Sequence, residues 1–230
     1  MQRLFKEIRH KNIDEVKKII EKEPSLVNCI SGKLPKKDES QSPLMVATKI
    51  GCFEICYYLI EKGADVNFME PLSAEPYRIL SIPVLFVAIN AVMQSLCYER
   101  YLVSDEALKF VKCLLEKGAD PNKQSSHGMS AVNNVLFELE NILKYYKNSH
   151  IRIKAKEQSL ELLNYLVSCG VDIEKWLDEG HYPLPDERFS NRYYYFELAI
   201  NDEIGIFVSK YYKTYNCLLN KIKRKLFAKK

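Results

Sequence analysis

The 230-residue sequence predicts an all-α solenoid of about five helix-turn-helix units. Two recurring signatures point to this fold class. The signature that closes a unit follows an apolar stripe at helical spacing and reads IEKGADVN at 60–67, LEKGADPN at 115–122 and VSCGVDIE at 167–174. The signature that opens a unit reads SPLMVA at 42–47, with related segments at 83–88 and 130–135. With 47% hydrophobic residues and 8 glycines, the composition excludes a disordered or collagen-like chain.

Each unit is bounded by residues that start and stop helices. Ser42 before Pro43 predicts the start of a first helix, because a serine oxygen can cap the helix and proline needs no amide partner there. Glycine supplies the left-handed residue that ends a helix, and Asp and Asn favour the turn that follows. The second helix of a unit is therefore expected to end at Gly63, Gly118 or Gly170. A more divergent first copy ends near Asn28.

Paired short helices, opened by a Thr-Pro-Leu-His-x-Ala-like motif and closed by Gly-Ala-Asp-Val-Asn, resemble the ankyrin repeat. From Gly118 to Val135 the chain is similar to the family's spacing without a gap. The resemblance extends, in weaker form, over residues 1–219. It implies an ankyrin-repeat solenoid with hairpin fingers between repeats and a function in binding other proteins.

The spacing of the signatures indicates insertions. Ala47 to Gly63 spans 16 residues, whereas the equivalent stretches 88–118 and 135–170 span 30 and 35. Repeats 3 and 4 thus carry 14 and 19 extra residues, which are expected to produce elongated helices. Further insertions are expected in the fingers at 30–41 and 68–81.

The expected division is a single ankyrin-repeat domain at 1–219 and a basic C-terminal tail at 220–230. The five repeats are placed at about 1–34, 35–70, 71–125, 126–178 and 179–219. The fifth repeat is placed by continuing the register of the other repeats, which puts its first helix around Phe196 to Ala199. It lacks the closing Gly-Ala-Asp, as expected of a C-terminal capping helix that covers the stack on one side only.

No pattern predicts a catalytic, metal or cofactor site. The four histidines have no partner at metal-ligand spacing, and no glycine-rich phosphate loop is present. We therefore expect no catalytic residue, no metal, no cofactor and no enzymatic activity. The alternative is an enzyme with a site in the C-terminal repeats, made from His181, Asp186, Glu187 and Arg188.

The sequence predicts a cytoplasmic protein, or one delivered into a host cytosol. Its seven cysteines include no CxxC pair, and several lie on apolar faces, which favours reduced thiols. Residues 1–12 are charged, unlike a signal peptide. The apolar run 79–97 is interrupted by Pro83 and polar residues, so a buried helix is a better interpretation than a transmembrane segment.

By the register of the ankyrin family, partner contacts are expected on the fingers and at the exposed ends of the first helices. The excess of 15 tyrosines over one tryptophan favours such an interface. The predicted protein-binding residues are Lys49, Asn90, Gln124, Ser126, His127, Met129, Phe137, Glu138, Trp176, His181, Tyr182, Tyr193, Tyr194 and Asn201. Asp38 and Gln41 occupy family contact positions in the first finger.

The formal charge of +4 comes from the tail, because residues 221–230 hold six basic and no acidic side chains. The acidic residues near Trp176 suit a basic protein partner, and nucleic acid is not favoured. The tail is interpreted as a solvated helix end, with weak membrane contact as the alternative. The predicted function is a non-enzymatic protein-binding module, monomeric when free, that recognises and inhibits a protein partner. The alternative is a toxin-immunity or host-directed effector protein of a bacterium or phage.

Overall fold

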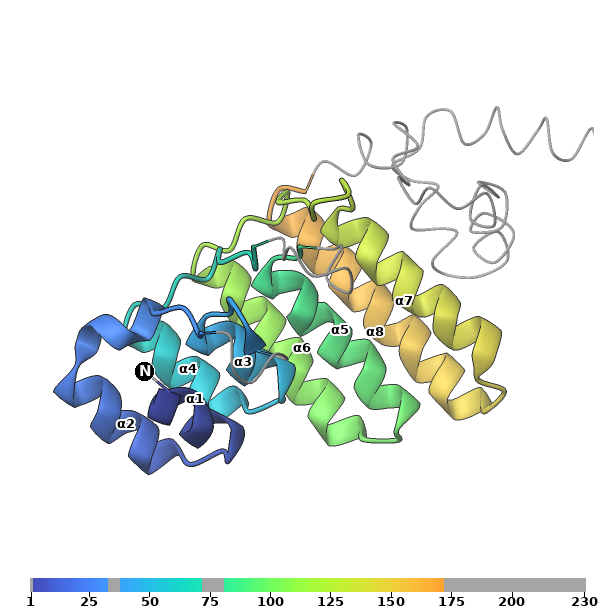
Figure 1. The fold of residues 1–230 in the computed structure, drawn as a ribbon. Coiled ribbons are helices and arrows are strands. Elements are labelled where there is room, and N and C mark those ends of the chain that lie inside the picture. The colour runs from blue at the N-terminus through green and yellow to red at the C-terminus, as the bar shows by residue number, and fades with distance from the viewer. Residues whose placement is uncertain (1, 33–37, 72–80, 172–230) are drawn as a thin grey trace, which may run out of the picture.

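The computed structural model describes residues 2–32, 38–71 and 81–171, where four pairs of antiparallel helices stack side by side (Figure 1). The pairs are α1 (Gln2–Arg9) with α2 (Ile13–Lys22), α3 (Pro43–Lys49) with α4 (Phe53–Glu61), α5 (Val84–Cys97) with α6 (Tyr101–Glu116), and α7 (Ala131–Tyr145) with α8 (Ser149–Ser168). A 3₁₀ turn, η1 (Pro24–Asn28), follows α2. The all-α solenoid is confirmed. The predicted fifth repeat, the capping helix and the basic tail lie outside the described residues.

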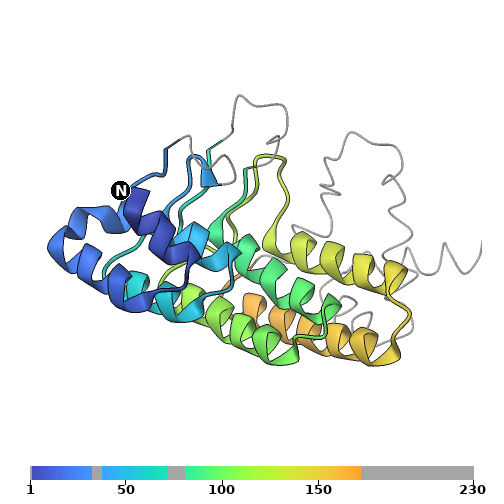
Figure 2. The ribbon, with the colours of Figure 1, turned by 60° about the horizontal axis from the view of Figure 1, so that its bottom comes forward.

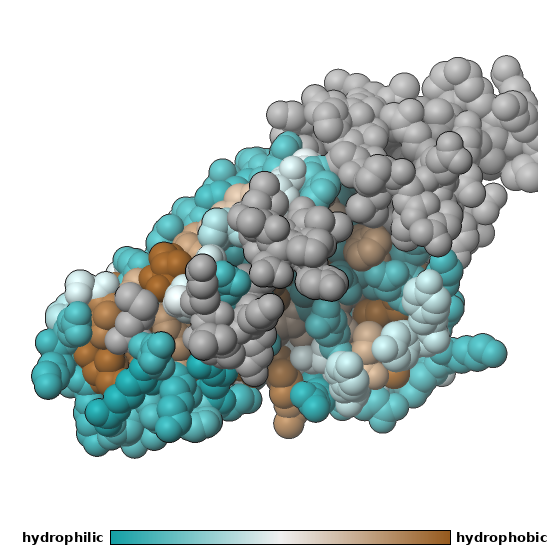
Figure 3. All heavy atoms as spheres, viewed as in Figure 1, coloured by the Kyte–Doolittle hydropathy of each residue, from teal (hydrophilic) through white to brown (hydrophobic). Residues whose placement is uncertain are grey.

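The helices form two layers (Figure 2). The first helices of the pairs, α1, α3, α5 and α7, pack in sequence as an inner layer. The second helices, α2, α4, α6 and α8, pack in sequence as an outer layer. Hydrophilic residues cover most of the coloured part of the face seen in Figure 3. Because each layer packs in chain order, each repeat contacts mainly its neighbours, as in other solenoids.

The predicted elongation of the third and fourth pairs is confirmed. α5 and α6 have 14 and 16 residues, where α3 and α4 have 7 and 9. α7 and α8 have 15 and 20 residues. All four pairs begin and end at the finger side, so the added turns lengthen the opposite end.

The helix boundaries follow the predicted signals. Ser42 Oγ accepts from Met45 N at 3.1 Å, and Ser130 Oγ accepts from Asn133 N at 3.1 Å, so both serines cap first helices. The closing glycines lie in the left-handed region, with φ of 89° for Gly63, 90° for Gly118 and 87° for Gly170.

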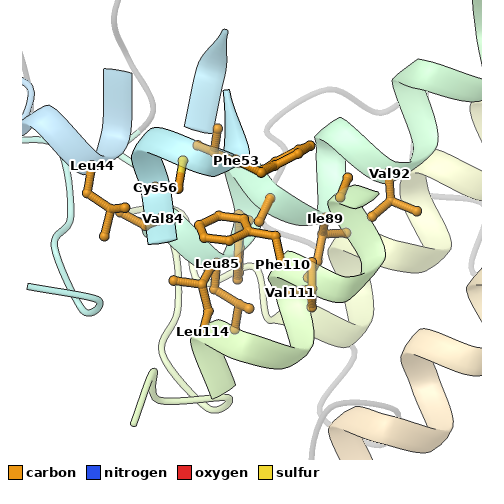
Figure 4. Close-up of a cluster of buried hydrophobic side chains, with 14 of the residues drawn as sticks. Leu44, Phe53, Cys56, Val84, Leu85, Ile89, Val92, Phe110, Val111 and Leu114 are labelled. Carbon is orange, nitrogen blue, oxygen red and sulfur yellow. The ribbon is translucent and has the colours of Figure 1, made fainter. Parts of the chain in front are cut away.

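The core lies between the layers and runs through the described repeats. Figure 4 shows its part between repeats 2 and 3. Phe110 of α6 lies 5.3 Å from Phe53 and 5.7 Å from Tyr57, measured between ring centroids, and so joins the outer helices of repeats 2 and 3. Cys56 packs as a small apolar residue, and its burial raises the pKa of its thiol. Most of the 79–97 run is the buried helix α5, as predicted. Within the described ranges, no helix is long and apolar enough to cross a membrane.

Candidate protein-binding surface

Three hairpin loops project from one end of the helices, and the predicted insertions at 30–41 and 68–81 belong to two of them. We call them finger 1 (29–32 and 38–42), finger 2 (66–71 and 81–83) and finger 3 (122–130). In finger 1, Ser31 N donates to Gln41 O at 2.9 Å. In finger 3, Ser125 N donates to Met129 O at 2.9 Å. Backbone bonds therefore connect the described arms of both hairpins.

Finger 2 is bonded to finger 3. Its two arms meet at an antiparallel bridge between Met69 and Pro83. Ser81 N donates to Ser126 Oγ at 2.9 Å, and Ser126 N donates to Ser81 O at 2.9 Å. The predicted contact residue Ser126 therefore also joins two fingers.

A buried carboxylate joins finger 1, finger 2 and helix α3. Glu70 Oε2 accepts from Lys49 Nζ at 2.7 Å and from Gln41 Nε2 at 2.9 Å. Glu70 is buried, and the Lys49 side chain is 33% exposed. The predicted contact residue Lys49 is thus held in place, with part of its side chain on the surface.

Asn90 connects the inner helices of repeats 3 and 4. Its Oδ1 accepts from Asn134 Nδ2 at 2.8 Å, and the same Nδ2 lies 3.5 Å from the carbonyl of Phe86. Asn90 is half-buried and Asn134 is buried. Asn90 therefore positions the inner layer and presents only part of its surface to a partner.

The remaining predicted residues of repeat 4 are half-buried. Gln124, His127 and Met129 lie on finger 3, where His127 Nδ1 is 3.3 Å from Ser126 Oγ and Met129 packs against the core. Phe137 and Glu138 lie on α7. Partial burial raises the pKa of the Glu138 carboxyl group. These residues border the surface formed by finger 3 and the inner layer.

The assignment of Asp38 and Gln41 to contact positions is wrong, because both side chains are buried. Asp38 forms an ion pair with Arg9 of α1, and Gln41 binds Glu70. They support finger 1 from inside. The other predicted contact residues, Trp176, His181, Tyr182, Tyr193, Tyr194 and Asn201, lie outside the described residues.

Glu70 and Asn134 were not identified from the sequence. Glu70 lies three residues after Asn67, inside an insertion that belongs to no repeat motif. Its partners Lys49 and Gln41 are 21 and 29 residues away, so no local spacing connects them. Asn134 sits on an apolar helix face, where a polar residue is a signal of an internal hydrogen bond.

Among residues 2–32, 38–71 and 81–171, no group of three His, Cys, Asp or Glu side chains could hold a metal ion. The arrangement offers shape and hydrogen bonds to a partner. A search of curated proteins found no match. The ankyrin-repeat family model matches residues 39–68, from the end of finger 1 through α3 and α4 to the start of finger 2. This match, together with the stacked helix pairs and fingers, supports an ankyrin-repeat protein.

Proposed function

We propose that the chain is a non-enzymatic protein-binding module that recognises one protein partner with finger 3 and the inner helices. Ankyrin repeats are generally protein-protein interaction modules, and the family is typically non-enzymatic. The bonding between fingers carries the proposal: Glu70 links fingers 1 and 2, and Ser81 links fingers 2 and 3. A surface fixed before binding loses little conformational entropy when a partner docks.

The more specific proposal is that binding inhibits the partner. A rigid face with several fingers can cover a functional site of another protein. We also propose that the free chain is monomeric and cytoplasmic, and that the acidic residues after Trp176 favour a basic partner. The toxin-immunity and host-effector roles are two biological settings for the same inhibitory contact.

The test begins with affinity capture from the native cell, using the full chain. The binding constant of the captured protein is then measured by calorimetry for wild type and for the double variant Gln124→Ala with His127→Ala. We expect at least a tenfold loss for the variant, about 1.4 kcal/mol. The matched control is Glu106→Ala with Lys109→Ala, an exposed pair on the outer helix α6.

An equal loss in the control would contradict binding through the inner face, and the absence of any captured protein would contradict the binding function itself. Inhibition is tested by adding the chain to its partner at equal concentration and measuring the partner's activity. An enzyme built on His181 and Glu187 remains the second candidate from the sequence. Replacing both should then abolish turnover while partner affinity stays unchanged.

A further inference from the structure

Exposed apolar side chains gather at the helix ends that lie opposite the fingers. Six large hydrophobic side chains are exposed in the described parts of the chain, and five of them lie at this end. These five, which we call the tip surface, are Tyr98, Leu102, Val103, Tyr145 and Ile153. Leu102 is 83% exposed, and the two tyrosines are 70% and 67% exposed. Single exposed apolar residues are ordinary, but a cluster indicates a contact surface.

The insertions of repeats 3 and 4 create the tip surface. α5 has 14 residues where α3 has 7, which makes it about 10 Å longer at 1.5 Å per residue. Gly118 and Gly170 end α6 and α8 at the finger side, and Ser130 caps α7 there, so the extra length projects at the other end. Figure 1 shows the α5–α6 and α7–α8 turns together at that end, and hydrophobic atoms reach the lower edge of the face in Figure 3.

The two turns of the tip contact each other. Asn148 Nδ2 donates to Glu99 Oε1 at 3.3 Å, which connects the α7–α8 turn to the α5–α6 turn. The rings of Tyr101 and His150 meet edge to face with 5.0 Å between centroids. The tip surface is therefore one continuous edge spanning two repeats.

Positive charge surrounds the apolar side chains of the tip. Arg100, Lys144 and Lys147 are exposed, and none of them forms an ion pair with a described residue. The Arg100 guanidinium lies 5.5 Å from the ring centroid of Tyr98, and Lys144 Nζ lies 5.2 Å from that of Tyr145. The carboxylate of Glu99 is hydrogen-bonded to Asn148. Because Arg100, Lys144 and Lys147 outnumber this carboxylate, whose charge an amide does not neutralise, the charge of the tip suits an anionic partner.

The geometry and charge of the tip surface favour a lipid bilayer as its partner over a second copy of the chain or a folded acidic protein. A second copy of the chain, docked tip to tip, would bring cations against cations. A folded acidic protein would have to match the positions of all five side chains along this edge. A lipid bilayer adapts to such an edge, because tyrosine rings suit the headgroup level and leucine suits the acyl boundary. Lys and Arg then bind the anionic headgroups.

We propose that the tip surface docks reversibly on an anionic lipid bilayer, with Leu102 entering the acyl boundary and the cations of the tip binding lipid phosphates. The helices would then point at the bilayer, and the fingers at their far end would face away from it. A protein partner and a membrane could therefore be bound at the same time.

The experiment is co-sedimentation of the full chain with vesicles of phosphatidylcholine, alone or mixed with phosphatidylserine. We expect wild type to bind the anionic vesicles about tenfold or more tightly than the neutral ones. The variant Leu102→Ser with Tyr145→Ser, which keeps the net charge, should lose about tenfold in binding to the anionic vesicles. Arg100→Gln with Lys147→Gln should lose a similar factor and weaken the dependence on salt.

The matched control is Ile30→Ser, because Ile30 is the exposed apolar residue at the finger end, and it should bind as wild type does. All variants should keep the wild-type circular dichroism, since each substituted side chain is exposed. Wild-type binding to neither vesicle would overturn the proposal. So would equal binding by wild type and the tip variants, which would assign any membrane contact to the basic residues 221–230. Retention on immobilised poly-glutamate without vesicle binding would indicate an acidic protein partner and also overturn it.

Discussion

Asn67 joins repeats 2 and 3 through both ends of its side-chain amide. Its Nδ2 donates to Gly118 O at 2.8 Å, and its Oδ1 accepts from Asp120 N at 2.7 Å. Asn28 makes the same pair of bonds one repeat earlier, at 2.9 and 2.8 Å. Asn122 donates to the helix end of the following repeat at 3.2 Å. The closing asparagine therefore bonds the carbonyl of the glycine that follows the next repeat's outer helix.

Asn67→Ala should destabilise the fold by about 1–2 kcal/mol, because two hydrogen bonds between repeats are lost and water replaces them only in part. Urea unfolding followed by circular dichroism measures the change. The control is Asn164→Ala, since Asn164 is exposed and bonds within its own helix to Leu160 O at 2.9 Å. It should cost less than about 0.5 kcal/mol. Equal costs would show that the bonds of Asn67 between repeats add nothing to stability.

Gly118→Ala should cost about 1–2 kcal/mol, because a Cβ is strained at a φ of 90°. The space around Gly118 is open, so the cost comes from the backbone alone. Gly32→Ala is the control: its surroundings are equally open and its φ is outside the left-handed region. It should change stability by less than about 0.5 kcal/mol. If chemical denaturation gave the two variants the same midpoint, the glycine would not be needed to end α6.

The sequence predicted the parts of the fold that local signals control. Ser42 and Ser130 cap helices, and Gly63 ends one, because each acts through its own backbone neighbours. The elongated helices were predicted because the extra residues kept the apolar spacing of a helix. Helix caps, closing glycines and apolar spacing each involve residues close together in the chain, so a single sequence is enough to identify them.

The surfaces were harder to predict because they depend on contacts between distant segments. Asp38 looked like an exposed finger residue, but it is buried beside Arg9 of α1. Glu70 is buried by partners that no motif connects to it. Leu102 lies in the first turn of a helix, and only the packed repeats show that it stands out at an end. The local pattern predicts an element, whereas exposure depends on its neighbours.

Glu70→Ala should destabilise the fold by about 2–3 kcal/mol, because the Gln41 amide then stays buried without this acceptor. A double-mutant cycle with Lys49→Ala should give a coupling of about 1 kcal/mol, limited by the solvent that reaches Lys49. The control cycle uses the exposed pair Glu106 and Lys109. Its coupling should be below about 0.5 kcal/mol. Urea unfolding that gave both pairs the same coupling would rule out a structural role for the Lys49 ion pair.

Glu138→Gln should make the protein more stable than wild type at neutral pH. Burial raises the pKa of Glu138 in the folded state, so the fold favours the protonated form. The stability from that protonated form is fully present below the unfolded pKa and is lost as the pH rises through the folded pKa. The gain from the variant should therefore be present at about pH 7 and fade toward about pH 4, near the ordinary pKa of glutamate. Thermal unfolding across this range measures it, with Glu54→Gln on α4 as the exposed control. A gain that stays constant with pH would show that the amide packs better than the acid, because only the charge of the carboxylate changes across this window.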